Sequence, residues 1–408
     1  MNNFLFISNN TVTDTGLSGG DRILAELIKN WSQKYPCGLL ATGECIGQMN
    51  RYQVLKKVTI LQSAPLKKRI TSFNNITYFI HGINRTLVSI YSVVKFWKQI
   101  KEYKYIYSAS DFYPDTIPAF LIKIFHPKTI WIGGFYLFAP KPWQKDNPYR
   151  TNFSRFLTNI YYWSTQQLSY FLVNNFADIV CVTSDPDIKH FETEFRTTKN
   201  IIVVRGGVDL TESRKYLKKY TPTFEGKKYR TLYIGRLHHQ KGPLELIDIW
   251  RLVVNKYPQA QLAMIGDGQL LADVKAKIKR LKLSKNITLF GFVDGQEKFK
   301  LFKLAAIAVH PATYDSGGMA TAEAMAWGLP GVSFDLEALK SYYPQGLIKT
   351  KCFDLQEFAD NIIKLTTDIK LYSKNAKLAI ELMEKHWAWD TRAMQVVNQV
   401  LAAKINHD

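Results

Sequence analysis

Two cations lie close together in the sequence, directly after a short apolar run. Residues 231–234 lead into Arg236 and Lys241, within the segment Gly235-Arg236-Leu237-His238-His239-Gln240-Lys241-Gly242. An arginine fork can bond two phosphate oxygens while a lysine supplies a point charge. The pair therefore suits a diphosphate group that departs with two negative charges. A solvated loop is the alternative, and we interpret the two histidines as loop residues because no third metal ligand accompanies them.

A second polar segment runs from Pro311 to Gly318 and is followed by an alanine-rich helical pattern over residues 319–327. Two glycines at a helix start expose backbone amides, and the helix dipole favours an anion there. Glu323 would lie about one turn inside this helix, where its carboxylate could accept both hydroxyls of a ribose. The alternative is that Asp315 or Ser316 caps the helix and that Glu323 is an exposed helix residue.

These segments need a scaffold, and the sequence predicts one in each half of the chain. Short β-branched runs alternating with helical patterns predict parallel sheets covered on both faces. In such sheets, ligands bind at the carboxyl ends of the strands. In the first half, we expect strands at 4–8, 105–107, 129–132, 179–183 and 201–204, and helices at 87–100 and 155–174. In the second half, we expect strands at 231–234, 261–265, 287–290, 306–310 and 331–334, and helices at 243–256, 269–281, 296–305 and 319–327.

Length and composition indicate a packed protein with two domains. A chain of 408 residues suits two domains of roughly 200 residues each. Hydrophobic residues at 46% and charged residues at 22% exclude the disordered and collagen-like classes. The four cysteines have no Cys-x-x-Cys spacing, so we expect buried free thiols rather than disulfides or zinc ligands. No apolar run reaches about 18 residues and no basic lead precedes residues 4–7, so we expect a cytoplasmic protein.

The net charge of +20 is concentrated in one part of the chain. No acidic residue lies between Glu44 and Glu102. The same stretch holds ten basic residues: Arg51, Lys56, Lys57, Lys67, Lys68, Arg69, Arg85, Lys95, Lys98 and Lys101. We expect this basic stretch, 51–101, to attract an anionic membrane and to attach the protein peripherally; the charge also permits nucleic acid as a less favoured partner. A solvated basic face, with the helix at 87–100 packed on the sheet, is the alternative.

Taken together, the motifs resemble the family-4 retaining glycosyltransferases (glycosyl transferases group 1), whose fold is called GT-B. The likeness covers nearly the whole chain and is strong in the C-terminal half. There it rests on residues 234–237 with Lys241-Gly242, on 264–268, on 289–293, on two acids separated by seven residues from Asp315 to Glu323, and on 323–330. In the N-terminal half it rests on residues 19–22, on Ala177-Asp178 with Thr183-Ser184, and on 207–209.

The resemblance implies two Rossmann-like, doubly wound α/β domains facing a central cleft. The acceptor domain would be 1–215 and the donor domain 216–385, with a polar linker at 215–228. A final helix in 386–408 could cross back to the N-terminal domain. The implied activity is transfer of a sugar, with retention, from a nucleotide-diphosphate donor to a lipid-linked, polysaccharide or other glycan acceptor. It requires no metal or cofactor, and the donor nucleotide could be UDP or GDP. A GT-B enzyme with another acceptor, such as nucleic acid, and a non-catalytic sugar-nucleotide-binding protein are the alternatives.

The resemblance also assigns residues to the site. Arg236, Lys241, Asp315 and Glu323 would be the catalytic group. The donor-binding residues would be Gly19, Gly20, Gly235, Gly266, Phe292, Val293, Ser316, Gly317, Gly318 and Met319.

Two positions depart from the family pattern. Asp315 stands where the family has glutamate, so its carboxylate is withdrawn by roughly 1.5 Å, which leaves the transferred sugar open. The family often has a histidine after a central N-terminal strand, whereas here Gly133-Gly134-Phe135 follows. The acceptor side would therefore use another group, for which Asp111 is a candidate.

Overall fold

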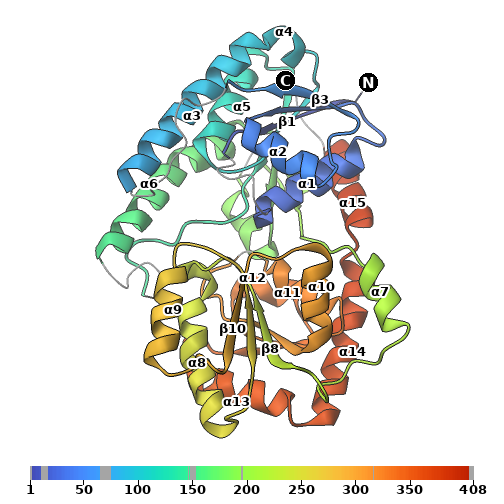
Figure 1. Cartoon of the computed structure of the whole chain (residues 1–408). Coiled ribbons are helices and arrows are strands. Elements are labelled where there is room, and N and C mark those ends of the chain that lie inside the picture. Colours follow the sequence, from blue (N-terminus) through green and yellow to red (C-terminus); the bar gives the residue numbers. More distant parts are fainter. Residues whose placement is uncertain are drawn as a thin grey trace. The chain divides into compact units, whose positions relative to one another are not determined.

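The computed structural model describes residues 2–10, 17–64, 75–145, 147, 153–193, 196–315 and 317–403. The chain forms two compact units, one made of the residues up to Val204 together with those from Asp390, the other of Arg205–Trp389. Each unit has its own parallel sheet with helices around it (Figure 1). The predicted α/β class with two doubly wound sheets is confirmed.

The sheet of unit 1 has the strand order β3-β2-β1-β4-β5-β6-β7, and its strands pair in parallel. The order reverses between β1 and β4, which pair directly, so the loops after these two strands meet at the switch point of the sheet. The strands are β1 Phe4–Ser8, β2 Cys37–Ala41, β3 Val58–Gln62, β4 Tyr105–Ser108, β5 Ile130–Gly134, β6 Ile179–Val182 and β7 Ile201–Val203.

The helices of unit 1 include the last helix of the chain. They are α1 Gly19–Trp31, α2 Gly43–Arg51, α3 Asn75–Lys95, α4 Trp97–Ile100, α5 Tyr113–Phe125, α6 Phe153–Phe176 and α15 Trp389–Ala402, with 3-10 turns η1 Asp185–His190 and η2 Thr198–Asn200. The indole of Trp31 in α1 donates to the carbonyl of Ala393 in α15 over 2.9 Å. The C-terminal helix thus packs on the unit built mainly from the N-terminal half.

The sheet of unit 2 has the order β10-β9-β8-β11-β12-β13, with its switch point between β8 and β11. Its strands are β8 Tyr229–Ile234, β9 Leu262–Ile265, β10 Ile287–Gly291, β11 Ala305–His310, β12 Gly331–Phe334 and β13 Leu347–Thr350. Its helices are α7 Thr211–Leu217, η3 His239–Lys241, α8 Pro243–Lys256, α9 Leu271–Arg280, α10 Gly295–Leu304, α11 Met319–Met325, α12 Glu337–Tyr342, α13 Leu355–Leu365 and α14 Ile369–His386.

The expected boundaries and the observed ones differ most in two places. The division between the units falls at Val204 and Arg205, so the polar stretch 215–228 lies inside unit 2, where α7 occupies its first residues. The helix expected at 87–100 begins at Asn75 and stops at Lys95, and Trp97–Ile100 forms the separate α4.

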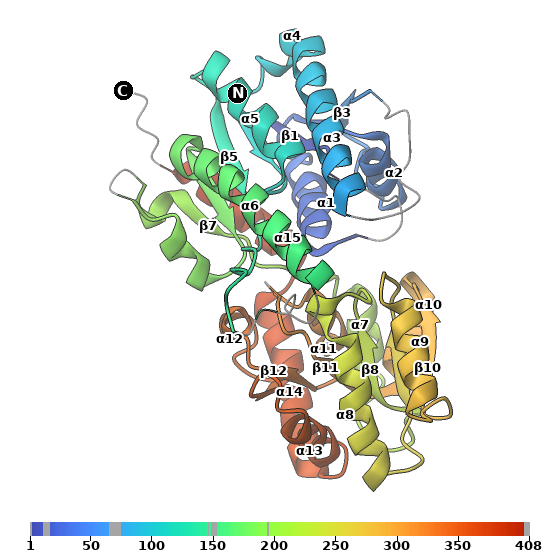
Figure 2. The same ribbon diagram turned by 90° about the vertical axis from the view of Figure 1, so that its left-hand side faces the viewer.

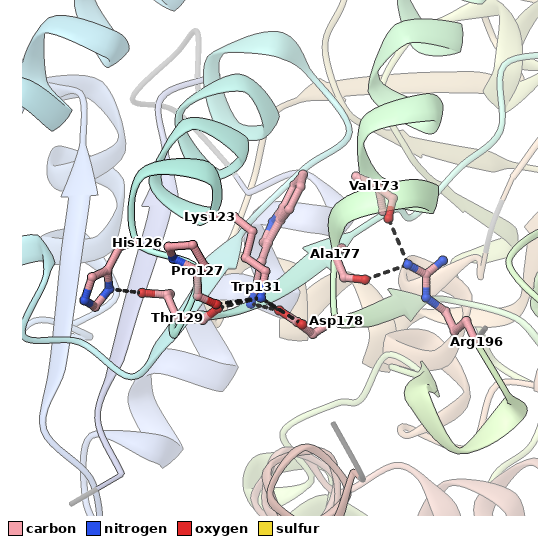
Figure 3. A network of polar contacts seen from close by, with 9 residues as sticks. All are labelled: Lys123, His126, Pro127, Thr129, Trp131, Val173, Ala177, Asp178 and Arg196. Atoms are coloured by element: carbon pink, nitrogen blue, oxygen red, sulfur yellow. Dashed lines mark hydrogen bonds and ion pairs between the residues drawn. The ribbon is translucent and has the colours of Figure 1, made fainter. Parts of the chain in front are cut away.

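A network of polar contacts fixes β5 and β6 of unit 1 to the helices beside them (Figure 3). The Lys123 ammonium lies 2.8 Å from Asp178 Oδ2 and also donates to the carbonyls of Pro127 and Thr129. The same Asp178 oxygen accepts from the Trp131 amide at 2.7 Å. Nearby, Arg196 donates to the carbonyl of Ala177 at the end of α6. Ala177-Asp178, one of the resembling motifs, is thus structural in this chain.

Loss of the Asp178 carboxylate should destabilise the protein, because it leaves the largely buried Lys123 ammonium without its counter-ion. We expect Asp178→Ala to lower the free energy of unfolding by about 3 kcal/mol or more. The measurement is urea denaturation followed by circular dichroism. The matched control is Asp360→Ala, which removes the exposed pair with Lys256 and should cost about 0.5 kcal/mol. Equal losses in both variants would contradict this role for the network.

Candidate active site

The direct pairing of β8 with β11 brings together two residues that lie far apart in the sequence. Lys241 follows β8 in the turn η3, and Asp315 follows β11. The Lys241 Nζ atom lies 2.5 Å from Asp315 Oδ2. The Asp315 side chain is only 8% exposed, so this ion pair is largely shielded from water. Two of the four predicted catalytic residues are therefore in contact.

The electrostatics of Asp315 favour its charged form. Burial by itself would raise the pKa of this carboxyl, but Lys241 and His310 outweigh burial and hold its pKa well below the ordinary value. His310 Nε2, at the end of β11, lies 3.0 Å from Asp315 Oδ2. The Lys241 ammonium thus has a carboxylate partner before any ligand enters.

Arg236 provides the unbalanced positive charge of this loop. Its side chain is exposed and makes no hydrogen bond or ion pair with the described residues. Its backbone is held, since the buried Tyr233 hydroxyl donates to the Arg236 carbonyl at 3.1 Å. A fixed backbone with an unengaged guanidinium can receive an anion without first breaking another contact.

Close backbone approach explains the glycines after β8 and β9. Gly266 has a φ of +137°, and a Cβ there would lie 1.9 Å from the Gly235 carbonyl oxygen. The Gly266 amide also donates to the Gly291 carbonyl at 2.8 Å, which ties the end of β9 to β10. Gly235 and Gly266 therefore hold neighbouring strand ends together, and any side chain at Gly266 would separate them.

The side chain of Tyr343 holds the two glycines before α11 in place. The buried Tyr343 hydroxyl contacts the carbonyls of Gly317 at 3.0 Å and Gly318 at 2.8 Å. The N-cap of α11 is Gly318, with no side-chain cap, so Asp315 is not the cap that the alternative reading required. The Gly317 amide instead donates to Asp315 Oδ1 at 3.3 Å. Ser316 lies outside the described residues.

Glu323 on α11 is partly buried and has a partner. Its side chain is 29% exposed, and its Oε2 atom lies 3.0 Å from the Nζ atom of Lys298 on α10. The alternative of a solvated helix residue does not fit this environment. Met319 begins the same helix. Of the two residues after β10, Phe292 is 55% exposed and Val293 packs partly against the core of unit 2.

The candidates in unit 1 lie near its own switch point. Gly19 and Gly20 begin α1, whose Ser18 cap and Asp21 form a reciprocal capping box. Asp111 follows β4, accepts from the Gln166 amide at 2.6 Å, and is buried. Burial raises the pKa of Asp111 to about 6, in the range useful for proton transfer.

Sequence reasoning missed three groups that the structure places beside these candidates. His310 is the last residue of β11, and Lys298 pairs with both Asp294 and Glu323. Asp115 on α5 is buried and accepts from the Asn9 amide and the Ser110 hydroxyl, and burial raises its pKa to about 7. The spacing of Asp294 and Lys298, four residues apart, was the available signal, but such pairs are common on solvated helices.

Among the described residues, no group of three or more His, Cys, Asp or Glu side chains could hold a metal ion. The cysteines Cys37, Cys45 and Cys181 are buried free thiols, and Cys352 is a partly exposed one. No helix within the described ranges is long and apolar enough to cross a bilayer.

Comparison with known proteins gives the site a family context. Residues 217–382 match the family model described as Glycosyl transferases group 1, and this segment contains the four predicted catalytic residues. An uncharacterised glycosyltransferase of Methanocaldococcus jannaschii is 29% identical over 174 residues, 41% of this chain and 42% of that protein. The Escherichia coli UDP-Gal:alpha-D-GlcNAc-diphosphoundecaprenol alpha-1,3-galactosyltransferase is 24% identical over 191 residues, 43% of this chain and 48% of that protein. The match thus spans less than half the length of each relative.

Solved structures resemble the chain over nearly its full length. The Anabaena protein HepE, crystallised with UDP and glucose, superposes with a TM-score of 0.69 at 17% identity and covers 98% of this chain and 100% of that one. At this identity the likeness shows the fold, which is that of the GT-B glycosyltransferases. The comparisons together support a GT-B glycosyltransferase.

The raised pKa of Asp111 predicts a pH-dependent stability. Because the carboxyl ionises near its ordinary value of 3.8 when unfolded but only at about 6 when folded, stability falls as the pH rises between these values. Asp111→Asn cannot ionise and so avoids this loss of stability. The free energy of unfolding of the variant, relative to that of wild type, should therefore rise between about pH 4 and about pH 7, by at most about 3 kcal/mol. Urea unfolding at the two pH values measures the difference. A constant difference between the two proteins would refute the prediction.

Proposed function

We propose that the chain is a retaining glycosyltransferase that moves a sugar from a nucleotide-diphosphate donor to a glycan acceptor. The observation that carries the proposal is the contact of Lys241 with Asp315 at the β8–β11 switch point, with the exposed Arg236 in the same loop as Lys241. Ligands of doubly wound domains bind at such points. The match of residues 217–382 to the glycosyl transferases group 1 model supports it independently.

In this proposal the two cations divide the work on the leaving diphosphate. Arg236 is exposed and can bond two phosphate oxygens at once. Lys241 is partly buried and oriented by Asp315, so its ammonium is already placed when the donor binds. The backbone amide of Gly318 would donate to a third oxygen. Charge stabilisation by these groups requires no metal ion.

The acceptor's proton would pass to a phosphate oxygen of the departing diphosphate, on the face from which the sugar leaves. This step retains the anomeric configuration and requires no protein nucleophile. Asp315 would contact the transferred sugar less closely than a glutamate, because its carboxylate is held at the loop by Lys241 and the Gly317 amide. The site would therefore accept a sugar with a larger substituent on the side that faces Asp315.

Removal of either cation should reduce turnover. Arg236→Ala should leave folding unchanged, whereas Lys241→Ala should also lower the free energy of unfolding, because it leaves the buried Asp315 carboxylate without its lysine partner. We expect Arg236→Ala and Lys241→Ala each to lower kcat by at least about 100-fold, since each serves charge on the leaving group. The assay uses the donor identified by a thermal-shift panel of UDP and GDP sugars. Lys275→Ala, an exposed lysine on α9, is the control and should keep wild-type turnover. Unchanged turnover in either site variant would remove that residue from the mechanism.

We propose further that the acceptor is met at a membrane, with a cytoplasmic protein attached peripherally through unit 1. The helix α3 is unusual for a surface helix of a soluble protein, because its buried side is polar over the described side chains, with Val93 as the exception. Arg85, Thr86, Ser89 and Ser92 are buried, while Ile80, Ile83, Leu87, Tyr91 and Val94 are exposed. The helix α6, seen beside α3 in Figure 2, exposes Phe153, Leu157, Ile160, Leu168 and Phe171.

The charges around these helices fit an anionic lipid surface. Neither α3 nor α6 contains an acidic residue. Lys95, Lys98 and Lys101 are exposed at the C-terminal end of α3 and along α4. Arg85 does not contribute, contrary to expectation, because it is buried and donates to the Asn9 carbonyl. Lys67, Lys68 and Arg69 lie outside the described residues. An apolar row flanked by lysines is typical of interfacial helices.

Reversal of the three lysine charges should weaken membrane binding. Each basic residue near an anionic surface contributes about 1 kcal/mol to membrane binding. The triple variant with Glu in place of Lys95, Lys98 and Lys101 should therefore bind anionic vesicles on the order of 100-fold more weakly. Co-sedimentation with anionic and neutral vesicles at about 0.1 M salt measures it. The matched control reverses Lys275, Lys279 and Arg280 on α9, which changes the net charge equally. Equal losses in both variants, or retention on DNA in place of vesicles, would refute membrane docking.

A further inference from the structure

Lys298 occupies an unusual place for a lysine. It lies on α10, yet its side chain is only 15% exposed and is directed at α11. Its Nζ atom lies 2.8 Å from Asp294 Oδ1 and 3.0 Å from Glu323 Oε2. Asp294 is the N-cap residue of α10, so the ammonium bridges the start of its own helix and the middle of the next one.

The ammonium keeps its charge in this position. Burial would lower the pKa of Lys298, but Glu323 and Asp294 outweigh burial and raise it. One buried cation therefore faces two carboxylates that would otherwise repel each other. The three side chains together carry a net negative charge. Among them, Lys298 supplies the attraction that keeps the two carboxylates close to each other.

The contact fixes the orientation of Glu323. A glutamate side chain has several rotatable bonds, and freezing it costs free energy that a binding event must otherwise supply. Lys298 engages Oε2, which leaves Oε1 and a remaining lone pair of Oε2 as acceptors. Two acceptor positions on one fixed carboxylate match the spacing of two adjacent hydroxyls on a five-membered sugar ring.

We propose that Lys298 is a positioning residue that holds Glu323 ready for the 2′- and 3′-hydroxyls of the donor's ribose and so makes the site select ribonucleotides over deoxyribonucleotides. This inference rests on the proposed function, since it takes Glu323 as the ribose contact. Lys298 does not touch the reacting atoms. It acts through Glu323, and its effect belongs to binding of the nucleotide and not to transfer of the sugar.

The test compares the dissociation constants of a ribonucleoside diphosphate and its 2′-deoxy counterpart, using whichever of UDP or GDP binds the wild type. Calorimetry on the full chain should show a preference of about 10-fold or more for the ribonucleotide in wild type, because a charged hydrogen bond is lost with the hydroxyl. K298M should reduce that preference to about 3-fold or less and weaken mainly the ribonucleotide. K298R should restore most of it.

K300M is the matched control, because Lys300 is exposed on the same helix and should leave both constants unchanged. If K298M fails to fold, K298Q, which is one bond shorter but keeps a neutral donor, should show an intermediate preference. A folded K298M that keeps the wild-type preference, or that loses both nucleotides equally, would overturn the positioning role. A wild-type chain that binds neither diphosphate would overturn the proposed function itself, and the inference with it.

Discussion

The direct hydrogen-bonded pairing of β8 with β11 is the constraint on which the site depends. The two strands are neighbours in space but are separated in sequence by two further strands and three helices. Their paired carboxyl ends bring Lys241 within 2.5 Å of Asp315, and the glycines around them let the backbone of adjacent loops approach closely.

The site of unit 2 has one region with unbalanced positive charge and another with net negative charge. The buried ion pair of Lys241 and Asp315 is neutral as a unit, whereas the exposed Arg236 is unbalanced. On α10 and α11, Lys298 is shared by two carboxylates, so the region around Glu323 is negative. A ligand with a negative diphosphate and a neutral, hydroxyl-rich sugar ring matches both regions, since each part meets the charge that suits it.

The sequence predicted helices and strands best where the period of the apolar residues agrees with the residues that mark the ends of an element. The helix α8 was predicted with the bounds found, because Pro243 marks its start and an apolar period of a helix follows. The start of helix α3 was placed wrongly, because most of its buried residues are polar and many of its apolar residues are exposed. Motif residues such as Arg236 and Glu323 could be named, but the Lys241–Asp315 and Lys298–Glu323 pairs could not. Those pairs depend on side-chain directions that only packing decides.

The discontinuity of unit 1 determines when it can be completed during synthesis. The ribosome delivers all seven strands of this unit first, then the whole of unit 2, and only at the end α15. Until α15 emerges, the Trp31 indole has no Ala393 carbonyl to bond. Unit 2 is one continuous segment of the chain, so its folding does not have to wait for α15. A premature stop near Trp389 would therefore spare the six-stranded sheet of unit 2 and harm the unit whose strands are made first.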